Sequence, residues 1–359
     1  MSGSPAITLI QTSVDAYRQA FVEEVAARIG RSFQIYTGDT YFDPAVRTRV
    51  VLPGHVTRVR NVFLVRRLLL WQRGAVRAGI SAEIAVLELN PRILSVWVTL
   101  LVRRALRRRT VLWGHAWPRR GRGAATDRLR HLMRILADAI LVYTETQARE
   151  LAEVMPTATI VAAPNALYRA SEIAPPEPLA ATDFLFVGRL VPAKKPMLLL
   201  RAFAAAAHAL VGARLVFVGE GLLLEPLQRE AERLGVRARV VFAGHVGARL
   251  ALAQIYARAV ATVSSGYVGL SATQSFSFGV PMLVARSEPH SPEIEAAVEG
   301  ENAVFFESDD EKSLADALIG VWRDSAEWAK RGASIAAVCR ESYSVEQMAD
   351  GFLRACLGR

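Results

Sequence analysis

The chain has 359 residues, 52% of them apolar, which is enough for two ordinary domains with a hydrophobic core each. Residues 1–180 hold 25 basic and 14 acidic residues, so the whole net charge of +10 lies in this half and favours an anionic partner. The cysteines are Cys339 and Cys356, which excludes a disulfide framework or a cysteine metal cluster and fits a reducing cytoplasm.

Short apolar runs alternate with helical patterns along the first half of the chain. We expect strands at 6–11, 33–38, 82–89, 109–115, 139–145 and 158–165, and helices at 14–29, 93–107 and 126–137. This rhythm is typical of a parallel sheet with helices on both faces. The first predicted domain therefore spans residues 1–173.

A Pro-rich segment, 174–183, is typical of a linker, and the same rhythm restarts after it. We expect strands at 184–190, 213–221, 240–246, 261–266 and 281–285, and helices at 196–210, 224–234 and 250–257. The second predicted domain spans 184–344, and one more helix is expected near 345–357. The chain is thus predicted to be α/β, with two Rossmann-like, doubly wound domains.

Two strand ends of the second predicted domain suit an anion. In SGYVGLSATQSFSFGVP (265–281), a glycine loop opens a short helix and presents the backbone N–H groups of Gly269, Leu270 and Ser271. In VGRLVPAKKP (187–196), Arg189 and Lys194 can converge on one diphosphate. The alternative for these two cations is a solvated turn.

Together these segments resemble the nucleotide-sugar signature of family 4 of the retaining GT-B glycosyltransferases. The resemblance covers nearly the whole chain and is strongest over 184–306. It implies that Arg189 and Lys194 neutralise the leaving diphosphate, so that neither a metal nor another cofactor is required. It also implies a GT-B architecture, with two domains facing a central cleft and the helix within 345–359 packed back on the first domain.

The resemblance also assigns donor-binding residues. The turns VGEG (218–221) and AGHV (243–246) resemble loops that lie near the nucleoside, and the glycines so assigned are Gly188, Gly219, Gly221 and Gly244. Two positions depart from the family pattern. Gly266 stands where the family usually has a first glutamate, and Gln274 stands where it has the second. Gln274 can keep a ribose contact in neutral form, whereas Gly266 leaves the donor sugar less constrained.

Three residues of the first domain are candidates for the reacting centre and the acceptor. His115 follows a buried strand, where relatives place a histidine that meets the donor sugar; the alternative is a histidine that caps its own loop. Tyr17 and Arg18 begin a helix where many relatives have a glycine-rich loop, so we expect them to face the acceptor.

The function that the resemblance implies is retaining, metal-independent transfer of a hexose-type sugar. The donor is a nucleoside diphosphate sugar, with a UDP-sugar favoured, and the acceptor is a hydroxyl on a lipid-linked or cell-surface glycan. A catalytically silent sugar-nucleotide-binding or scaffold protein is the alternative that Gly266 and Gln274 support. A nicotinamide-dependent dehydrogenase is disfavoured, because no G-x-G-x-x-G follows the first strand.

The basic half leaves a choice of partner open. The clusters 103–109 and 117–130, with Trp97, Trp113 and Trp117 nearby, suit an anionic membrane surface, and they also suit a solvated helix. No nucleic-acid recognition motif is visible. No signal-peptide pattern begins the chain, and its apolar runs are shorter than the roughly 20 residues of a membrane span. We therefore expect a cytoplasmic protein, soluble or peripheral on the inner face of the membrane.

Overall fold

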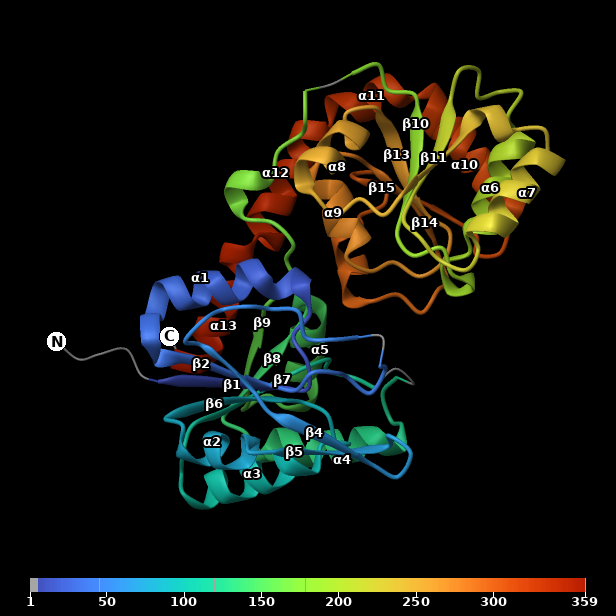
Figure 1. Cartoon of the computed structure of the whole chain (residues 1–359). Helices are drawn as coiled ribbons and strands as arrows, with labels where there is room; N and C mark the ends of the chain where they lie inside the picture. The colour runs from blue at the N-terminus through green and yellow to red at the C-terminus, as the bar shows by residue number, and fades with distance from the viewer. Residues whose placement is uncertain (1–5, 45, 119–120, 178, 359) are drawn as a thin grey trace. The chain divides into compact units, whose positions relative to one another are not determined.

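The computed structural model describes residues 6–44, 46–118, 121–177 and 179–358 (Figure 1). The chain divides into two compact units: unit 1 is Met1–Leu167 with Val345–Arg359, and unit 2 is Tyr168–Ser344. The division falls between residues 167 and 168, ahead of the Pro-rich segment in which the sequence suggested a linker. Helix α13 (Val345–Leu357) belongs to unit 1, although it is last in the chain.

Unit 1 is built on a parallel seven-stranded sheet with the order β3-β2-β1-β6-β7-β8-β9. Its strands are β1 (Ile7–Gln11), β2 (Phe33–Thr37), β3 (Val56–Arg58), β6 (Ile84–Glu88), β7 (Thr110–Trp113), β8 (Ala139–Val142) and β9 (Thr159–Ala162). An antiparallel hairpin, β4 (Arg60–Leu64) and β5 (Leu69–Arg73), and helix α2 (Ala75–Ser81) follow β3. The sequence rhythm did not predict the hairpin or α2.

Helices cover both faces of this sheet. They are α1 (Gln19–Ile29), α3 (Leu94–Ala105), α4 (Ala125–Leu136) and α5 (Glu145–Val154), together with α2 and α13. Successive strand residues point to opposite faces, so Leu9 packs in the core under α1 and α13, whereas Ile10 packs in the core under α2 and α3. Gly351 lets α13 approach β9 closely, because a Cβ there would lie 2.4 Å from the Ala162 carbonyl oxygen.

Unit 2 repeats this plan with a parallel six-stranded sheet of order β12-β11-β10-β13-β14-β15. Its strands are β10 (Asp183–Val187), β11 (Arg214–Val218), β12 (Val240–Gly244), β13 (Ala259–Ser264), β14 (Met282–Ala285) and β15 (Ala303–Phe306). The strand order reverses between β10 and β13. In doubly wound sheets, ligands bind beyond the carboxyl ends of the strands at such a point.

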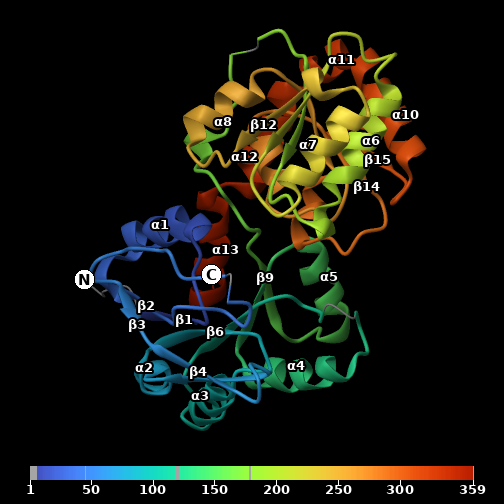
Figure 2. The same ribbon diagram turned by 45° about the vertical axis from the view of Figure 1, so that its right-hand side comes forward.

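The helices of unit 2 form two layers around its sheet (Figure 2). One face carries α6 (Pro196–Ala206), α7 (Leu224–Arg233) and α10 (Glu311–Arg323), and the other carries α8 (Arg249–Tyr256), α9 (Ser271–Ser277) and α12 (Gly332–Tyr343). Helix α11 (Ser325–Lys330) connects α10 to α12. Phe184 and Phe217 lie in the first core layer, and Leu185 and Val216 lie in the second.

Both cysteines are buried and free, Cys339 in unit 2 and Cys356 in unit 1. Burial raises the pKa of each thiol to about 12, so neither is a reactive thiolate at neutral pH. In the part of the chain that the structure describes, no helix is both long enough and apolar enough to traverse a bilayer.

The expectation that the whole 103–109 cluster lies on a surface is wrong for Arg103, which is fully buried. Its guanidinium donates to the carbonyl oxygens of Gly79 at 2.6 Å and Ala82 at 2.7 Å, and so caps the end of α2. Arg109 likewise donates to the Ala355 carbonyl of α13 at 3.0 Å. Trp113 is fully buried as well. Arg119 and Arg120 of the second cluster lie outside the described residues.

Candidate functional site

Lys194 stands at the carboxyl ends of β10 and β13, at the end of the short helical turn Pro192–Lys194. Its Nζ donates to the Tyr267 carbonyl oxygen at 2.7 Å and lies 3.6 Å from the centroid of the Tyr267 ring. The same Nζ lies 4.0 Å from the position that a Cβ on Gly269 would take. The ammonium group is therefore held directly against the glycine loop 265–270.

The Lys194 side chain loses its charge at a lower pH than an ordinary lysine. Burial, followed by repulsion from the nearby Arg189 guanidinium, lowers the pKa of Lys194 to about 8, and the buried Glu293 carboxyl acts in the opposite direction. Arg189 itself is exposed, so it remains accessible to a ligand. Two neighbouring cations, with Lys194 partly buried, form a site that an anion would stabilise.

The glycine loop packs its backbone directly on the Lys194 segment. A Cβ on Gly266 would lie 2.4 Å from the Ala193 carbonyl oxygen and 2.8 Å from the Lys194 Cα, which is closer than real Cβ atoms approach. The Ser265 hydroxyl donates to the carbonyl oxygens of Lys194 at 3.1 Å and Lys195 at 2.8 Å. Gly266 is thus required by the close approach of two backbone segments.

His290 fixes the middle of the same loop. Its Nδ1 accepts the Val268 backbone N–H at 2.9 Å, so its Nε2 carries the proton and donates to the Ala285 carbonyl oxygen at 2.9 Å. The Ser291 N–H donates to the Val268 carbonyl at 2.9 Å. Burial lowers the pKa of His290, which keeps it in the neutral form that this pattern needs. The sequence offered no spacing that would have identified this role.

The three backbone N–H groups predicted to bind an anion follow this fixed loop. Val268 N–H is satisfied by His290, but Gly269, Leu270 and Ser271 donate no backbone hydrogen bond within the described chain. Gly269 and Leu270 precede the seven-residue helix α9, and Ser271 is its first residue. Gly269 lies beside Lys194, so the structure brings this loop together with one of the two predicted cations.

Gln274 lies one turn into α9 and is already engaged by the protein. Its Nε2 donates to the Tyr168 hydroxyl at 3.2 Å. Tyr168 packs edge-on against Phe278, with ring centroids 5.8 Å apart, and the Arg249 guanidinium lies 5.5 Å from the Tyr168 ring centroid. Gln274 therefore has a fixed orientation, and no sequence pattern identified its tyrosine partner.

The four glycines assigned to the nucleoside side form a continuous row at the ends of β10, β11 and β12. Gly188 N–H donates to the Val218 carbonyl at 2.9 Å, and Gly219 N–H donates to the Gly244 carbonyl at 2.7 Å. A Cβ on Gly219 would lie 2.0 Å from the Gly188 carbonyl oxygen, and one on Gly221 would lie 2.4 Å from the Leu190 carbonyl oxygen. Contact between backbones thus accounts for Gly219 and Gly221.

Lys195 points away from this cluster of cations. Its Nζ bonds the carboxylates of Glu288 at 2.6 Å and Asp309 at 2.7 Å. Its backbone is left-handed, with a φ of 49°, which directs its side chain differently from that of Lys194. The structure therefore shows that Lys194 contacts the glycine loop and that its neighbour Lys195 does not, which the sequence could not establish.

The candidates in unit 1 gather at the carboxyl end of its sheet. The Arg18 guanidinium lies 4.4 Å from the centroid of the Trp113 ring and donates to the hydroxyl groups of Tyr17 at 3.1 Å and Tyr143 at 3.3 Å. It also donates to Asn165 Oδ1 at 3.4 Å. Arg18 is only 8% exposed, so the expectation that it faces an acceptor is replaced by a role in holding the two tyrosines.

His115 is exposed and adjoins this tyrosine cluster. Its ring centroid lies 4.8 Å from that of Tyr143, and its carbonyl oxygen accepts a hydrogen bond from Arg130 Nη1 at 2.9 Å. His115, Tyr17 and Tyr143 are therefore within one connected group in unit 1. Tyr143 was missed by the sequence reasoning, because a tyrosine at a strand end carries no distinctive pattern.

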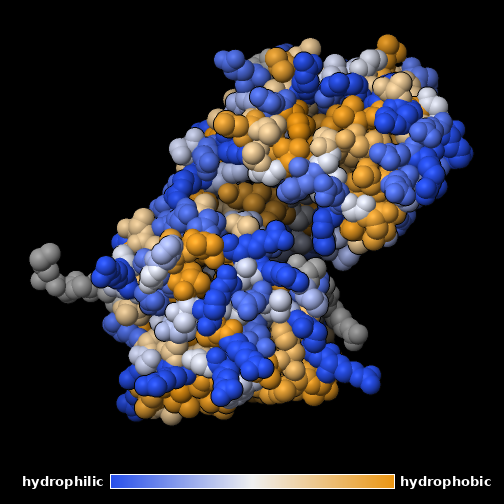
Figure 3. All heavy atoms as spheres, viewed as in Figure 1, coloured by the Kyte–Doolittle hydropathy of each residue, from blue (hydrophilic) through white to orange (hydrophobic). Residues whose placement is uncertain are grey.

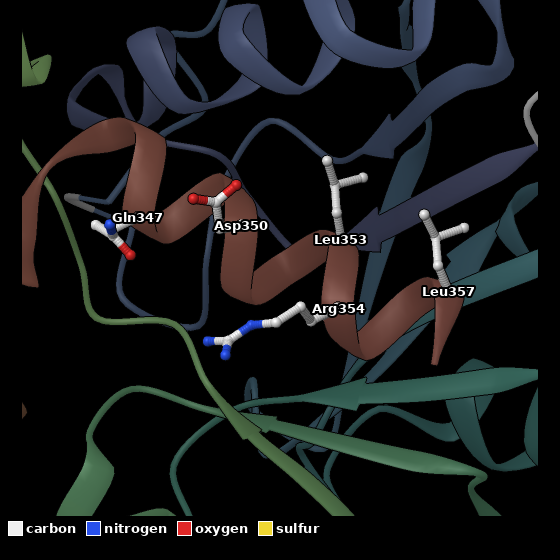
Figure 4. Close-up of a pocket in the computed structure, with 5 residues that line it drawn as sticks. All are labelled: Gln347, Asp350, Leu353, Arg354 and Leu357. Carbon is white, nitrogen blue, oxygen red and sulfur yellow. The ribbon is translucent and has the colours of Figure 1, made fainter. Parts of the chain in front are cut away.

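A pocket elsewhere in unit 1 contains none of these residues. It is lined along α13 by Gln347, Asp350, Leu353, Arg354 and Leu357 (Figure 4). Asp350 is bound by Arg28 of α1, so its charge is already compensated. Among the described residues, no group of three or more His, Cys, Asp or Glu side chains is arranged to hold a metal ion.

A model of a known protein family matches most of unit 2. Residues 171–335 match the family model of glycosyl transferases group 1, and no curated protein matches the chain. The structure of HepE from Anabaena in complex with UDP has a TM-score of 0.71 at 13% identity, covering 99% of this chain and 100% of that one. The segment 171–335 that matches the family model contains Arg189, Lys194 and the whole glycine loop.

Two further solved structures resemble the whole chain. The apo form of the lipopolysaccharide outer core galactosyltransferase WaaB has a TM-score of 0.66 at 14% identity, covering 98% of this chain and 99% of that one. Sucrose-phosphate synthase from Thermosynechococcus elongatus has a TM-score of 0.65 at 16% identity, covering 98% of each chain. At these identities the likeness shows the fold. It confirms the prediction of two Rossmann-like α/β domains of the GT-B type.

Proposed function

We propose that this protein is a glycosyltransferase that moves a sugar from a UDP-sugar to an acceptor hydroxyl. The observation that carries the proposal is the Lys194 ammonium, held against the glycine loop beside Arg189 at the strand reversal of unit 2. This arrangement lies within the segment that matches the family model. UDP is favoured because the HepE structures hold UDP or UDP-glucose.

In this proposal the cations and the loop stabilise the departing diphosphate. Arg189 and Lys194 offset the charge that develops as the bond from the anomeric carbon to the phosphate oxygen breaks. The N–H groups of Gly269, Leu270 and Ser271 are fixed in advance by the bonds that His290 and Ser291 make to Val268. Preorganised donors of this kind cost little reorganisation during the reaction, so side chains and amides supply the charge neutralisation that a metal ion would otherwise provide.

The stereochemical course that we propose is retention, as in family 4. The acceptor oxygen forms its bond to the anomeric carbon on the face that the diphosphate leaves. The acceptor proton passes to the departing phosphate oxygen, so that charge and atoms balance. The glycine row Gly188, Gly219, Gly221 and Gly244 is assigned to the nucleoside side, and Gln274, oriented by Tyr168, is assigned to the ribose.

Unit 1 is assigned to the acceptor and to the reacting centre. His115 is the exposed member of its cluster and is proposed to contact the transferred sugar, with Tyr17 proposed on the acceptor side. Arg18 acts through Tyr17 and Tyr143 as a positioning residue. The acceptor is proposed to be a lipid-linked or cell-surface glycan, with the protein on the cytoplasmic face of a membrane.

The test is to add a panel of nucleoside diphosphates and their sugars and to measure binding as a shift in the protein's melting temperature. We expect UDP and a UDP-sugar to raise the melting temperature of the native protein. Arg189→Gln and Lys194→Gln should each weaken the binding of UDP by about 10- to 100-fold. Each substitution removes a charged hydrogen-bond partner that contributes roughly 1.5–3 kcal/mol. Lys195→Gln is the matched control and should bind normally, because that lysine is paired with Glu288 and Asp309.

Two results would count against the proposal. If no nucleotide shifts the melting temperature, unit 2 does not hold a donor site. If UDP binds but neither hydrolysis nor transfer of the donor sugar can be measured with any glycan acceptor, the catalytically silent sugar-nucleotide-binding alternative is favoured instead.

The affinity for UDP should depend on pH through Lys194. Its pKa is about 8 in the free protein, so the ammonium that an anion needs is present at pH 7 and is lost as the pH rises above about 8. A bound diphosphate favours the charged form, so binding above this pH takes up a proton. Isothermal titration from pH 7 to about 9.5 should show weakening affinity, and Lys194→Arg should flatten the profile. An unchanged slope in that variant would remove Lys194 from the site.

A further inference from the structure

We infer that the outward face of α3 and α4 in unit 1 docks on an anionic phospholipid bilayer. This α3–α4 face is defined by exposed apolar and basic side chains: Val98, Leu101, Leu106, Leu129, Leu132, Ile135, Arg104, Arg107, Arg108 and Arg128. The inference names a surface for the membrane location proposed above, and it does not depend on sugar transfer. It narrows the basic clusters that the sequence suggested to their exposed arginines, since Arg103 is buried.

The first observation is that α4 carries exposed apolar residues on its outer side. Its inner side is buried, with Met133 fully inaccessible and Arg134 2% exposed. Its outer side presents Leu132 at 53% and Ile135 at 52% exposure. A surface helix of a globular protein normally carries polar residues on its outer side. Exposed apolar side chains that gather in this way mark an interaction site.

Helix α3 extends the same surface, since it packs directly against α4. Leu101 on α3 is 55% exposed, and Leu106 at its C-cap is 53% exposed. Figure 3 shows apolar and strongly polar residues interspersed over the part of unit 1 that carries these helices. The exposed apolar side chains thus come from two adjacent helices.

The turn of the β4–β5 hairpin adds similar residues beside the start of α3. Val65 is 63% exposed and Leu68 is 58% exposed. Arg92, which precedes α3, donates to the Leu68 carbonyl oxygen at 2.8 Å and so ties the turn to the helix. Val65 and Arg66 have left-handed backbones, with φ of 47° and 49°, so this turn exposes bulky residues at a local conformational cost.

The second observation is that the exposed charges around these aliphatic residues are mostly positive. No Asp or Glu occurs between Glu88 and Asp127 in the sequence. Asp127 is bound to the buried Arg134 at 2.8 Å and therefore does not offset the outward charges. Arg104, Arg107 and Arg128 are exposed and belong to α3, its C-terminal end and α4. A partner with negative charge and an apolar interior fits both observations.

An anionic bilayer has this chemistry. Helices with a basic side and exposed Leu or Ile lie in the headgroup region, with apolar side chains reaching the acyl chains and arginines contacting phosphates. Nucleic acid would engage the arginines but not exposed aliphatic side chains, since strands are held by aromatic stacking and charge. A second copy of the chain would bring like charges together. Of these three partners, the bilayer is the one that would contact both the arginines and the aliphatic side chains of the α3–α4 face.

The experiment is flotation of the full-length protein with vesicles of phosphatidylglycerol and phosphatidylcholine, compared with vesicles of phosphatidylcholine alone. We expect binding to the anionic vesicles only, and weakening as salt is added. Arg104→Glu with Arg107→Glu should reduce partitioning by at least about tenfold, because each basic residue near an anionic surface contributes about fivefold. Leu101→Glu with Leu132→Glu should reduce it similarly.

Matched controls lie in unit 2, where Leu250 is 78% and Val211 is 77% exposed. Leu250→Glu with Val211→Glu should leave partitioning unchanged, and all variants should keep the native melting temperature. Equal binding to neutral vesicles, or full binding by both α3–α4 variants, overturns the inference. So does a concentration-dependent dimer that the leucine variants abolish, or binding of an oligonucleotide that the arginine variants abolish.

Discussion

Gly266→Glu should abolish UDP binding, even though it introduces the residue type that family 4 usually has at this position. The reason is steric, since even a Cβ at residue 266 would lie 2.4 Å from the Ala193 carbonyl oxygen. To make room, the loop must move away from the Lys194 segment, which breaks the two hydrogen bonds of the Ser265 hydroxyl. Lys194 would then lose its alignment with the glycine loop.

Gly266→Ala separates the effect of the Cβ from that of the carboxylate. We expect this variant to lose UDP binding by more than about 100-fold and to destabilise unit 2 by about 1–3 kcal/mol, the usual effect of overpacking. Gln274→Glu is the control for a restored glutamate. It adds no atoms where backbones touch, so it should fold normally and keep UDP binding. The steric explanation is wrong if Gly266→Ala binds UDP as the native protein does in titration calorimetry.

Arg103→Ala should be the most destabilising of the arginine substitutions in unit 1. The buried guanidinium satisfies carbonyl oxygens of Gly79, Ala82 and Glu83, and donates to Thr110 Oγ1 at 2.8 Å. Burial, followed by repulsion from Arg108, lowers the pKa of Arg103 to about 10, so it is charged at neutral pH. Removing it leaves several buried acceptors without donors, which costs about 3–5 kcal/mol.

The neighbouring Arg104 provides the matched comparison, because it lies on the same helix but is exposed. Arg104→Ala should change stability by less than about 0.5 kcal/mol. Urea unfolding, with hydrogen exchange of β6 and β7 to report on unit 1, separates the two variants. Equal stability of both variants would show that water or a neighbouring side chain replaces the lost donor, contrary to the expectation.

The repeating strands and helices were predictable because parallel strands are buried on both faces and appear as continuous apolar runs. The helix expected near 345–357 is confirmed as α13, Val345–Leu357. The β4–β5 hairpin was missed because its strands are short, β4 is only partly buried, and each strand has an arginine at one end. Its turn also lacks glycine, although Val65, Arg66 and Arg67 all have positive φ. Bulky residues in such a turn give no sequence signal.

Part of the candidate site could be predicted from the rule that ligands bind at the carboxyl ends of parallel strands. This rule brought Lys194 and the glycine loop together, and the structure places them in contact. It could not identify Tyr267 or His290 as the groups that fix them, because those contacts depend on loop paths that no local pattern encodes. The run RRALRRR did not show that Arg103 is buried while Arg104 is exposed, because that depends on which side of α3 meets α2 and β7.

The place of α13 in the chain affects how the molecule is assembled on the ribosome. Residues 168–344 form unit 2 without interruption, whereas unit 1 needs residues 345–359 to cover one face of its sheet. Met348 and Phe352 of α13 complete the core that begins with Ile7, more than three hundred residues earlier. Domains usually fold in the order of their synthesis. Here unit 1 is completed only after unit 2 has been synthesised, so part of one face of its sheet stays uncovered until α13 has been made.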